Sequence, residues 1–341
     1  MATPLSFSFI VPFHRDLPSL ARCLEGLTPL PADSELIVVA DGAVDDCRPL
    51  AARHHARVLV VPGPSGPAVA RNAAAATAGG DVLVFIDADV VVSRAGLNRL
   101  AAVFVEQPRT AAVFGSYDDR PADPGFVSQY KNLSHCFIHR TAASEARTFW
   151  AGFGAVRGEA FRRVGGFDER FARPSVEDID FGYRLTQAGY RILLEPALEA
   201  THLKRWTAAS AIVSDVRDRG IPWTQLIWRY RALSNDLNLR TEYRLSVVLA
   251  YLAVAVLALG VYDLRVLAAL PLIGGGMVLL NRRYYRFLHA KRGAWFAARA
   301  FVLRLVQDLG NGLSFAAGTA LFVLSHQATK MSDDRRRSDR I

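Results

Sequence analysis

Two carboxylates stand one residue apart at the end of a fully apolar run. Val82–Ile86 contains only apolar residues, and Asp87-Ala88-Asp89 follows it directly. Charges at the end of a buried strand are costly unless something pairs with them, and a hard divalent cation is the natural partner. Mg²⁺ or Mn²⁺ held there could also bind phosphate oxygens, which would give a nucleoside diphosphate a place to bind. The alternative is a solvated acidic turn.

Two further segments could contact such a nucleotide. Asp41-Gly42 follows the apolar run Leu36–Ala40, and an acid there could accept a hydrogen bond from a base N–H. The alternative is an ordinary Asp-Gly turn. Gly66–Asn72 has the composition of a helix start with Arg71 one turn in. Free backbone N–H groups and an arginine would suit an anion, although Arg71 could also be a surface residue.

Three acids, Glu177, Asp178 and Asp180, lie at the start of a helical pattern. One of these carboxylates could act as a general base that deprotonates a hydroxyl group. In the competing interpretation, Ser175 or Asp178 is only a helix N-cap. Because three acids cannot all be buried and ionised without help, we expect at least one to face solvent or a cation.

His202 follows the last strand expected in this half of the chain, Arg191–Leu194. A lone histidine is usually structural. Its place after a strand also allows it to be a metal ligand.

Short apolar runs alternate with helix-like segments over the first part of the chain. The runs are Phe7–Val11, Leu36–Ala40, Val58–Val61, Val82–Ile86 and Ala112–Phe114, and Leu17–Gly26 and Pro67–Ala78 are helix-like. This alternation predicts an α/β domain with a largely parallel sheet that is covered on both faces. Ligands bind beyond the carboxyl ends of such strands, which is where Pro12, Asp41 and Asp87 stand. We expect the segment 117–150 to be irregular.

The second part of the chain is strongly apolar and basic. Ala208–Leu233 reads as an interfacial amphipathic helix. Leu245–Tyr262 has eighteen uncharged residues, about 27 Å as a helix, against a bilayer core of about 30 Å. Val266–Leu280 and Leu309–Ala328 are further apolar runs, and the tail from Lys330 should be disordered. The alternative is a buried helical hairpin in a soluble protein.

The net charge of +9 comes with basic clusters that flank the apolar segments, which favours a membrane surface over nucleic acid as partner. Seven basic residues lie in 282–304 but only one in Asp263–Arg265. The positive-inside rule therefore places the first domain and the 282–304 loop on the cytoplasmic side. The expected location is the inner or plasma membrane, as a multi-pass protein. Three widely spaced cysteines fit a reducing compartment, and the first residues do not read as a signal peptide.

Taken together and in this order, the motifs resemble those of the inverting family 2 glycosyltransferases, from about Ser6 to Trp206. The family fold is a Rossmann-like GT-A nucleotide-sugar transferase domain with a mixed, mainly parallel sheet. The resemblance is carried by Pro12, Asp41-Gly42, Ala70-Arg71-Asn72, Asp87-Ala88-Asp89, Gly165-Gly166-Phe167-Asp168 and Glu177-Asp178.

The resemblance implies a role for each matching residue. Nucleotide binding falls to Pro12, Asp41, Arg71 and Asp87, with Asp41 on the base. Asp89 would be a ligand of the divalent cation, Mg²⁺ or Mn²⁺, and His202 is the second expected ligand from its place after the strand rather than from the resemblance. Asp178 would be the catalytic base with Glu177 beside it. The substrate pocket would involve Trp150, Gly152, Gly154, Asp168, Arg205 and Trp206.

Two departures bear on specificity. Ala40 stands where the family often has a second acid, and this difference affects which nucleobase the site would select. His202-Leu203-Lys204-Arg205-Trp206 resembles the Gln-x-x-Arg-Trp signature of processive polysaccharide synthases, but begins with histidine. Two or three apolar segments are few for a polymer channel, so we expect transfer of single sugars.

The expected activity is transfer of a sugar from a nucleotide-diphospho-sugar, a UDP-sugar, to a membrane-associated acceptor such as a polyprenyl phosphate. The alternatives are a processive polysaccharide synthase, an inactive sugar-nucleotide-binding scaffold and a nucleotidyltransferase. A nucleotidyltransferase would carry a glycine-rich phosphate loop near its N-terminus, and Pro12–Arg15 is not such a loop. The expected domains are a catalytic domain at 1–206, interfacial helices at 207–244, a membrane region of two or three helices at 245–329 and a disordered tail at 330–341.

Overall fold

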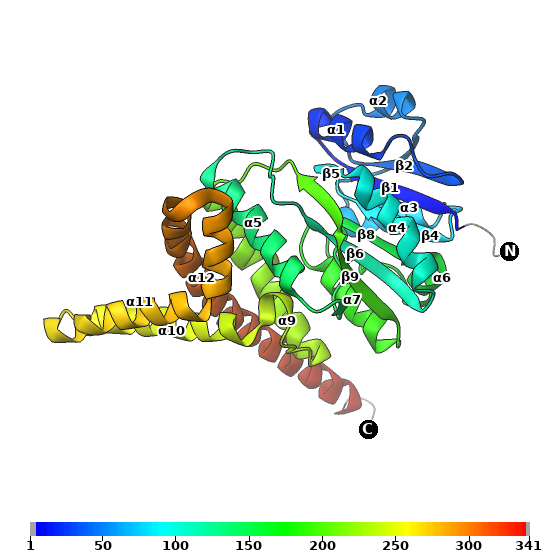
Figure 1. Ribbon diagram of the computed structural model, residues 1–341. Coiled ribbons are helices and arrows are strands. Elements are labelled where there is room, and N and C mark those ends of the chain that lie inside the picture. Colours follow the sequence, from blue (N-terminus) through cyan, green and yellow to red (C-terminus); the bar gives the residue numbers. More distant parts are fainter. Residues whose placement is uncertain (1–4, 339–341) are drawn as a thin grey trace. The chain divides into compact units, whose positions relative to one another are not determined.

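This computed structural model describes residues 5–338 (Figure 1). The chain divides into two units, Met1–Thr207 and Ala208–Ile341. A mixed nine-stranded sheet forms the centre of the first unit. The strands are β1 (Phe7–Phe13), β2 (Ser34–Asp41), β3 (Arg57–Val61), β4 (Val82–Ile86), β5 (Val90–Val92), β6 (Thr110–Tyr117), β7 (Glu145–Ala146), β8 (Phe153–Arg157) and β9 (Arg191–His202). Their order is β3-β2-β1-β4-β8-β6-β9-β5, and β7 pairs with β9 outside this path.

Most strands of this sheet run in one direction. β1 to β4, β6 and β9 are parallel to one another, whereas β5, β7 and β8 run against their neighbours. The predicted mixed, mainly parallel sheet is therefore confirmed. Its antiparallel strands insert in the second half, where β8 joins β4 to β6.

The helices of this unit are α1 (Leu17–Leu27), α2 (Arg48–Arg53), α3 (Pro67–Ala75), α4 (Arg94–Glu106), α5 (Phe126–Thr141), α6 (Gly158–Arg163) and α7 (Glu177–Gln187). The two helices expected at Leu17–Gly26 and Pro67–Ala78 are confirmed as α1 and α3. Asp16 begins α1 by accepting a hydrogen bond from the Ser19 N–H at 3.2 Å, which satisfies one of the free donors of the first turn.

Five phenylalanines from distant parts of the chain pack around the end of β4. Phe85 lies 5.1 Å from Phe167 and 5.5 Å from Phe161, measured between ring centroids, and Phe167 lies 4.8 Å from Phe181. Phe149 completes the group at 5.4 Å from Phe181. Burial of one such ring stabilises the fold by roughly 1.5–3 kcal/mol. The cluster therefore holds the loop that carries Phe167 against β4.

The expectation that the segment 117–150 is irregular is wrong, because this segment contains the sixteen-residue helix α5. The apolar stripe of this helix is interrupted by buried polar residues, among them Ser128, Gln129 and Asn132. Asn132, for example, donates to the Asp118 carbonyl at 2.8 Å. A helix that buries polar groups in hydrogen bonds lacks the periodic pattern from which helices are read.

The last strand is also longer than expected. β9 continues from Leu194 to His202 because its second half pairs with β5 and with the end of β6. His202 is therefore the last residue of a strand rather than the start of a loop.

The second unit is helical. Its elements are α8 (Ala208–Val213), the π-helix η1 (Ser214–Gly220), α9 (Ile221–Tyr230), the 3₁₀ helix η2 (Leu237–Leu239), α10 (Thr241–Leu259), the 3₁₀ helix η3 (Leu264–Ala268), α11 (Ala269–Leu280) and α12 (Arg282–Ser338). α9 and η1 pack against α12, and α10 packs against α11 and α12. Gly293, with φ of 82°, interrupts α12.

The backbone of the tail expected to be disordered, 330–341, is helical as far as Ser338, and residues 339–341 lie outside the described residues. Its sequence places acids at Asp333 and Asp334 three residues before Arg336 and Arg337. Opposite charges at this spacing favour a helix.

By length and hydropathy, α10 is the one helix within 5–338 that is suited to cross a bilayer. A second crossing is available only if η3 and α11 together with α12, which meet at a bend of 78°, count as one broken span. The expected multi-pass anchoring by two or three separate helices is not supported by this finding and stays a prediction.

Candidate active site

The carboxyl ends of β1, β2 and β4 bring sequence-predicted residues to one edge of the sheet. Pro12 of β1 pairs with Val39 of β2, and Asp41 ends β2. β4 runs parallel to β1 on its other side, and Asp87 follows its last residue. Parallel strands expose their carboxyl ends at the same edge, so Pro12, Asp41 and Asp87 converge as expected.

Asp41 is buried and its carboxylate holds the loop that precedes α3. Oδ1 accepts a hydrogen bond from the Ser65 N–H at 2.7 Å, and Oδ2 accepts one from the Gly66 N–H at 2.8 Å. Gly66 has φ of 96°, and a Cβ atom there would lie 2.6 Å from the Ala172 carbonyl oxygen. Each carboxylate oxygen can accept a further bond, so the role of Asp41 on a nucleobase stays a prediction.

Arg71 is not a surface residue. Its side chain is 4% exposed, and its guanidinium donates to Glu177 Oε1 at 2.9 Å and to Asp87 Oδ1 at 2.7 Å. Burial lowers the pKa of Arg71, but the charges of Asp87, Glu177 and Asp178 outweigh burial and raise it. The guanidinium therefore stays charged and joins α3, the end of β4 and the start of α7.

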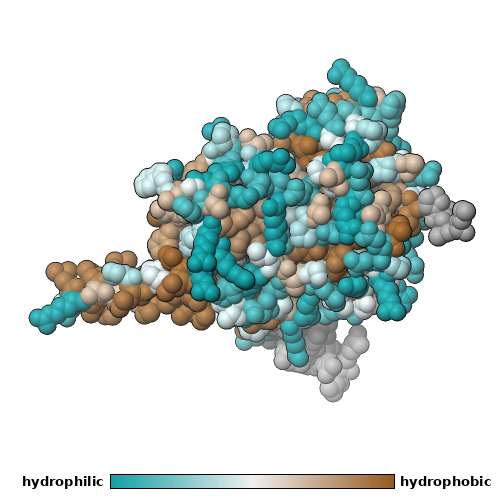
Figure 2. Space-filling view, in the orientation of Figure 1, coloured by the Kyte–Doolittle hydropathy of each residue, from teal (hydrophilic) through white to brown (hydrophobic). Residues whose placement is uncertain are grey.

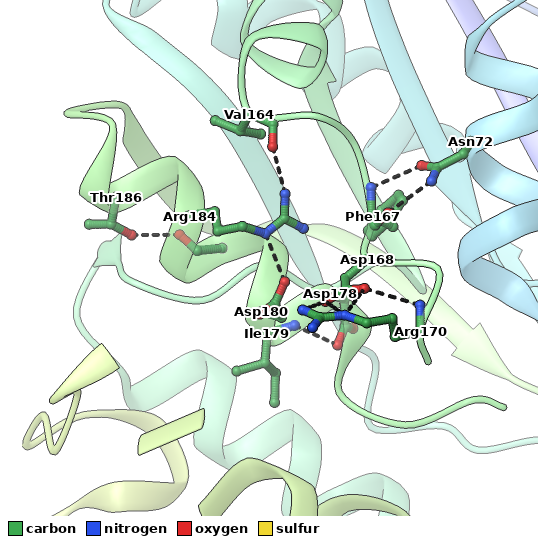
Figure 3. A network of polar contacts seen from close by, with 11 residues as sticks. Asn72, Val164, Phe167, Asp168, Arg170, Asp178, Ile179, Asp180, Arg184 and Thr186 are labelled. Atoms are coloured by element: carbon green, nitrogen blue, oxygen red, sulfur yellow. Dashed lines mark hydrogen bonds and ion pairs between the residues drawn. The ribbon is translucent and has the colours of Figure 1, made fainter. Parts of the chain in front are cut away.

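Asn72, the next residue, clamps the loop after α6 and was not predicted as a site residue. Its amide nitrogen donates to the Phe167 carbonyl at 2.8 Å and its amide oxygen accepts from the Phe167 N–H at 2.9 Å (Figure 3). The amide nitrogen also donates to Glu169 at 2.9 Å. Gly166 has φ of 67°, and a Cβ atom there would lie 2.6 Å from the Asn72 amide oxygen. The only sequence signal for this role is the position of Asn72 beside Arg71.

The three acids of α7 are all buried and all have partners. Glu177 accepts from Arg71 and, at 2.9 Å, from the Ser175 N–H. Asp180 accepts from Arg184 at 2.7 Å (Figure 3). Two of these carboxylates thus face a cation, as expected for a group of acids that cannot all be ionised and unpaired.

Asp178 points to the backbone that follows Trp150. Its Oδ2 accepts from the Ala151 N–H at 3.2 Å, and its Oδ1 accepts from the Ile179 N–H at 2.8 Å. The helix N-cap is Val176, with no side-chain cap, so the alternative that Ser175 or Asp178 caps the helix is wrong. The positive end of the helix dipole stabilises a carboxylate in this first turn.

Asp89 faces His202 rather than Arg71. His202 Nε2 lies 3.5 Å from Asp89 Oδ2, and the Leu203 N–H donates to the Asp89 carbonyl at 2.8 Å. Burial alone raises the pKa of Asp89, but the His202 imidazole and the Lys204 ammonium outweigh burial and lower it. The side chain keeps an exposed fraction of 35%, so one side of the carboxylate is open.

Tyr117 fixes the ring of His202 and was also missed from the sequence. The two rings are stacked, with centroids 4.5 Å apart and planes at 10°. The neighbouring Asp118 accepts a hydrogen bond from the Thr201 hydroxyl at 2.5 Å, and its N–H donates to the Ala200 carbonyl at 2.9 Å. The end of β6 therefore orients the end of β9.

The fit of a divalent cation depends on this donor set. Within residues 5–338 no group of three or more His, Cys, Asp or Glu side chains could hold a metal ion. Asp89 and His202 supply two donors with an open side, whereas Asp87 is engaged by Arg71. Two protein donors fit a cation that takes its remaining ligands from phosphate oxygens and water, so the residues fit such a cation but do not form a closed site.

Trp150 and its two glycines form one packing unit. The Trp150 ring is 8% exposed and lies 4.8 Å from the ring of Tyr117. A Cβ atom at Gly152 would lie 2.5 Å from the Trp150 ring, and one at Gly154 would lie 2.3 Å from the Trp150 carbonyl oxygen. Both glycines are thus required for the chain to fold back over Trp150, and their contact with a sugar stays a prediction.

The remaining predicted residues lie outside the Arg71 network. Arg170 forms hydrogen bonds with both oxygens of Asp168 at 2.6–3.0 Å and lowers the pKa of that carboxyl. The Arg205 side chain is 84% exposed and lies 4.0 Å from Asp123. The Trp206 ring is covered by Lys204, at 4.2 Å from its centroid.

Comparison with known proteins agrees with this geometry. Residues 8–170 match the sequence profile of glycosyl transferase family 2. This segment of the chain is a family 2 glycosyltransferase domain. The match begins in β1 and includes Asp41, Arg71, Asp89 and Asp168, while α7 and His202 lie beyond it.

Two curated relatives share part of this chain. The pre-mycofactocin glycosyltransferase of Mycobacterium tuberculosis is 32% identical over 216 residues, which cover 59% of this chain and 44% of that protein. The succinoglycan biosynthesis protein ExoA of Rhizobium meliloti is 29% identical over 208 residues, or 56% of this chain and 61% of ExoA. The chain thus matches less than two thirds of either relative.

Two solved structures share the fold of the glycosyltransferase domain. A mannosyltransferase of Pyrobaculum calidifontis, solved with GDP-Man and Mn²⁺, superposes with a TM-score of 0.52 at 18% identity and covers 94% of this chain and 88% of its own. GalNAc-T7, solved with UDP, GalNAc and Mn²⁺, gives 0.51 at 16% identity over 68% of this chain and 50% of its own. At these identities the likeness shows the fold, which is GT-A-like.

Proposed function

We propose that this chain is an inverting, metal-dependent glycosyltransferase that moves a sugar from a nucleotide-diphospho-sugar to a membrane-associated acceptor. The observation that carries the proposal is the buried Arg71, which binds Asp87 of the Asp-x-Asp motif and Glu177 of the Glu-Asp motif. One guanidinium thereby joins the two motifs that such a reaction needs, and the family 2 domain supports this reading.

Asp178 is the proposed general base. It lies in the first turn of α7, where Ala151 and Ile179 N–H groups orient its carboxylate. The acceptor oxygen attacks the anomeric carbon as the bond to the diphosphate oxygen breaks, and Asp178 takes the proton of the acceptor hydroxyl. One direct displacement of this kind inverts the anomeric configuration.

Asp89 and His202 are the proposed ligands of Mg²⁺ or Mn²⁺. A bound cation would supply charge stabilisation to the leaving diphosphate. The two solved structures with this fold both contain Mn²⁺, which supports a divalent cation here. Asp87, held by Arg71, is assigned to the nucleotide side of the site.

A UDP-sugar is the proposed donor and a lipid that carries a free hydroxyl group is the proposed acceptor. A polyprenyl phosphate does not fit this step, because its phosphate oxygens are already ionised and need no base. One structural neighbour was solved with GDP-Man and the other with UDP. The choice of uracil as the nucleobase therefore rests on Asp41 alone. The exposed apolar helices of the second unit support a lipid acceptor, and the basic residues that flank them support a cytoplasmic catalytic domain. A processive synthase would need a channel through the membrane, for which α10 and one bent pair of helices are few.

The test is nucleoside diphosphate release by the detergent-solubilised full chain with a panel of UDP- and GDP-sugars, with Mn²⁺, Mg²⁺ or EDTA, and with or without membrane lipid extract. We expect release from a UDP-sugar that needs the cation, rises with lipid and is lost in Asp89→Asn. The control is Glu159→Gln, which changes an exposed acid on α6. Absence of both donor binding and release across the panel would instead support the scaffold alternative.

A further inference from the structure

Two helical segments of the second unit form an antiparallel hairpin, called here the α10–α11 hairpin and comprising residues 241–280. The Asn281 amide donates to the Ser246 hydroxyl at 2.6 Å and so joins the two ends of the hairpin at its base. At the other end, a Cβ atom at Gly260 would lie 2.3 Å from Leu267 Cδ2. The two limbs are therefore in register from base to tip.

The two limbs are equally long and expose apolar side chains. The nineteen residues of α10 span about 28 Å, and the five of η3 with the twelve of α11 also span about 28 Å. Figure 2 shows apolar residues along this hairpin. Exposed apolar side chains on it include Val248, Leu252, Leu257, Leu259, Leu272 and Leu279. This length is close to the roughly 30 Å of a bilayer core.

Charge marks the two ends of the hairpin. Its base carries Arg240, Arg244, Arg282, Arg283 and Arg286, which we call the arginine collar. No charged residue lies between Leu245 and Tyr262 or between Val266 and Leu280. Such a distribution matches an apolar core with anionic headgroups at the collar.

The tip carries one acid and one base. Asp263 accepts a hydrogen bond from the Arg265 N–H at 2.9 Å. A charged tip is costly in hydrocarbon but not among headgroups. The tip is therefore suited to the headgroup layer opposite the collar.

The third apolar run, Leu309–Ala328 of α12, packs on other helices along one face only, because Leu313, Phe315, Leu321, Val323 and Leu324 are exposed. A Cβ atom at Gly318 would lie 2.7 Å from the Ile221 carbonyl oxygen, and one at Gly310 would lie 3.0 Å from Val216 Cγ2. Trp228 of α9 donates to the Thr319 hydroxyl at 2.8 Å. Gly310 and Gly318 thus serve packing against η1 and α9, whereas a Cβ atom at Gly312 would lie 2.3 Å from the ring of Tyr251 in α10. Beyond the hairpin the chain turns into α12 at a bend of 78°.

We propose that the α10–α11 hairpin crosses an anionic lipid bilayer as one unit, with the arginine collar at one face and the tip at the other, while α12 stays on the collar side. The chain would then cross twice, and its segments before and after the hairpin would lie on the same side. This proposal concerns anchoring and does not depend on the proposed glycosyl transfer, because its test needs no catalysis.

The first test is single-cysteine labelling of the full chain in oriented membrane vesicles with a membrane-impermeant maleimide. The native Cys23, Cys47 and Cys136 are buried. Leu264→Cys marks the tip, Leu233→Cys the segment before the hairpin and Leu324→Cys the late part of α12, all exposed positions. We expect the tip to react from one side of the vesicle and the other two positions from the opposite side.

Either of two labelling results would overturn the proposal. Reaction of the tip from the same side as Leu233→Cys would show that the hairpin does not cross. Reaction of Leu324→Cys from the tip side would show that α12 crosses. The helical circular dichroism signal and the thermal unfolding of each variant, measured in detergent, identify any variant that has lost its fold.

The second test separates a bilayer from a second copy of the chain as the partner of the hairpin. Leu252→Glu with Leu257→Glu should abolish integration into vesicles, measured as resistance to alkaline extraction, whereas the control Val105→Glu, an exposed residue of α4, should retain it. Full integration of the double variant with loss of self-association would make the hairpin a dimer contact and refute the proposal.

The collar has its own test. Arg282→Glu, Arg283→Glu and Arg286→Glu together should lower partition into phosphatidylglycerol-containing vesicles about a hundredfold, since each basic residue near an anionic surface contributes roughly fivefold. Partition into phosphatidylcholine vesicles should be unchanged. Equal partition of wild type into both kinds of vesicle would contradict the role given to the collar.

Discussion

At the scale of single residues, Arg71 carries more of the site than its neighbours do. It is a buried cation with two carboxylate partners. The free-energy cost of removing such a cation comes mainly from the carboxylates that are left without a partner. Removal of the guanidinium would leave the buried carboxylate of Glu177 without its cation, whereas Asp87, whose side chain is 36% exposed, would lose its partner beside solvent. Lysine cannot replace it, because a single ammonium does not reproduce the planar fork that meets two acids.

Arg71→Met should therefore destabilise the fold by about 3–5 kcal/mol, the usual cost of breaking a buried ion pair. Arg71→Lys should retain the fold better but lose most of the turnover. Chemical denaturation and nucleotide release measure the two effects. Arg163→Met, an exposed arginine of α6, is the control, and equal stability of Arg71→Met and this control would contradict the assignment.

Tyr117 is predicted to act through His202. Tyr117→Leu removes the stacked ring and should raise the Mn²⁺ concentration for half-maximal nucleotide binding about tenfold, in line with losses of partners that orient metal ligands. Tyr117→Phe keeps the ring and should restore the wild-type value. Calorimetric titration of the protein with UDP, in the presence of Mn²⁺ or EDTA, measures this requirement without turnover. An unchanged Mn²⁺ requirement in Tyr117→Leu would argue against this role.

At the scale of elements, the site is an assembly of segments that the sequence places far apart. The end of β4, the start of α3 and the first turn of α7 meet through Arg71, and the loop after α6 joins them through Asn72. Glu177 lies 106 residues from Arg71 along the chain. The rigid elements thus position the carboxylates, and two side chains of α3 hold the elements together.

Asn72→Ala should release the loop that carries Phe167 and Asp168. The substitution removes three hydrogen bonds and leaves the Phe167 N–H and carbonyl without that partner, a loss of about 1–3 kcal/mol per buried group. Faster amide hydrogen exchange at 166–170 together with a lower kcat is the expected result. Protection equal to that of wild type would show that the phenylalanine cluster alone fixes this loop.

Elements with a clear apolar pattern could be predicted from the sequence. β1, β2, β4 and the helices α1 and α3 follow from short apolar runs and from helix-start residues, and the acid that ends β2 and the acid that follows β4 mark the site edge. α5 could not be predicted, because it buries Ser128, Gln129 and Asn132 in hydrogen bonds. The partners of Arg71 and Asn72 also could not, since nothing in a single sequence pairs residues across such separations.

At the scale of the whole molecule, the chain combines a GT-A-like domain with a helical unit of different physical character. The first unit buries its apolar residues in a sheet, while the second leaves many of them exposed on α10 and α11. Exposed apolar surface of this extent marks an interaction site. The two units therefore need different conditions for their stability.

Acid should destabilise the first unit through carboxylates whose pKa is lowered in the folded state. Burial raises the pKa of Glu35, but hydrogen bonds from Gly79 and Ser8 and the charge of Arg57 lower it. A lowered pKa contributes stability that is present above the unfolded value, about 4.3 for glutamate, and is lost as pH falls through the folded value. Glu35→Gln should lower the Tm at neutral pH and leave a smaller fall of Tm between neutral and acid pH. An identical pH profile in both proteins would contradict this.

We propose that Asp178 takes the proton of the acceptor in a site held together by Arg71. This proposal is tested most directly by Asp178→Asn, which preserves the shape of the side chain but removes the base. We measure nucleotide binding by calorimetry and sugar transfer to membrane lipid extract in the same preparation. We expect Asp178→Asn to bind UDP with Mn²⁺ as wild type does and to lose transfer by about 10²–10⁴-fold. Transfer at the wild-type rate in Asp178→Asn would contradict it.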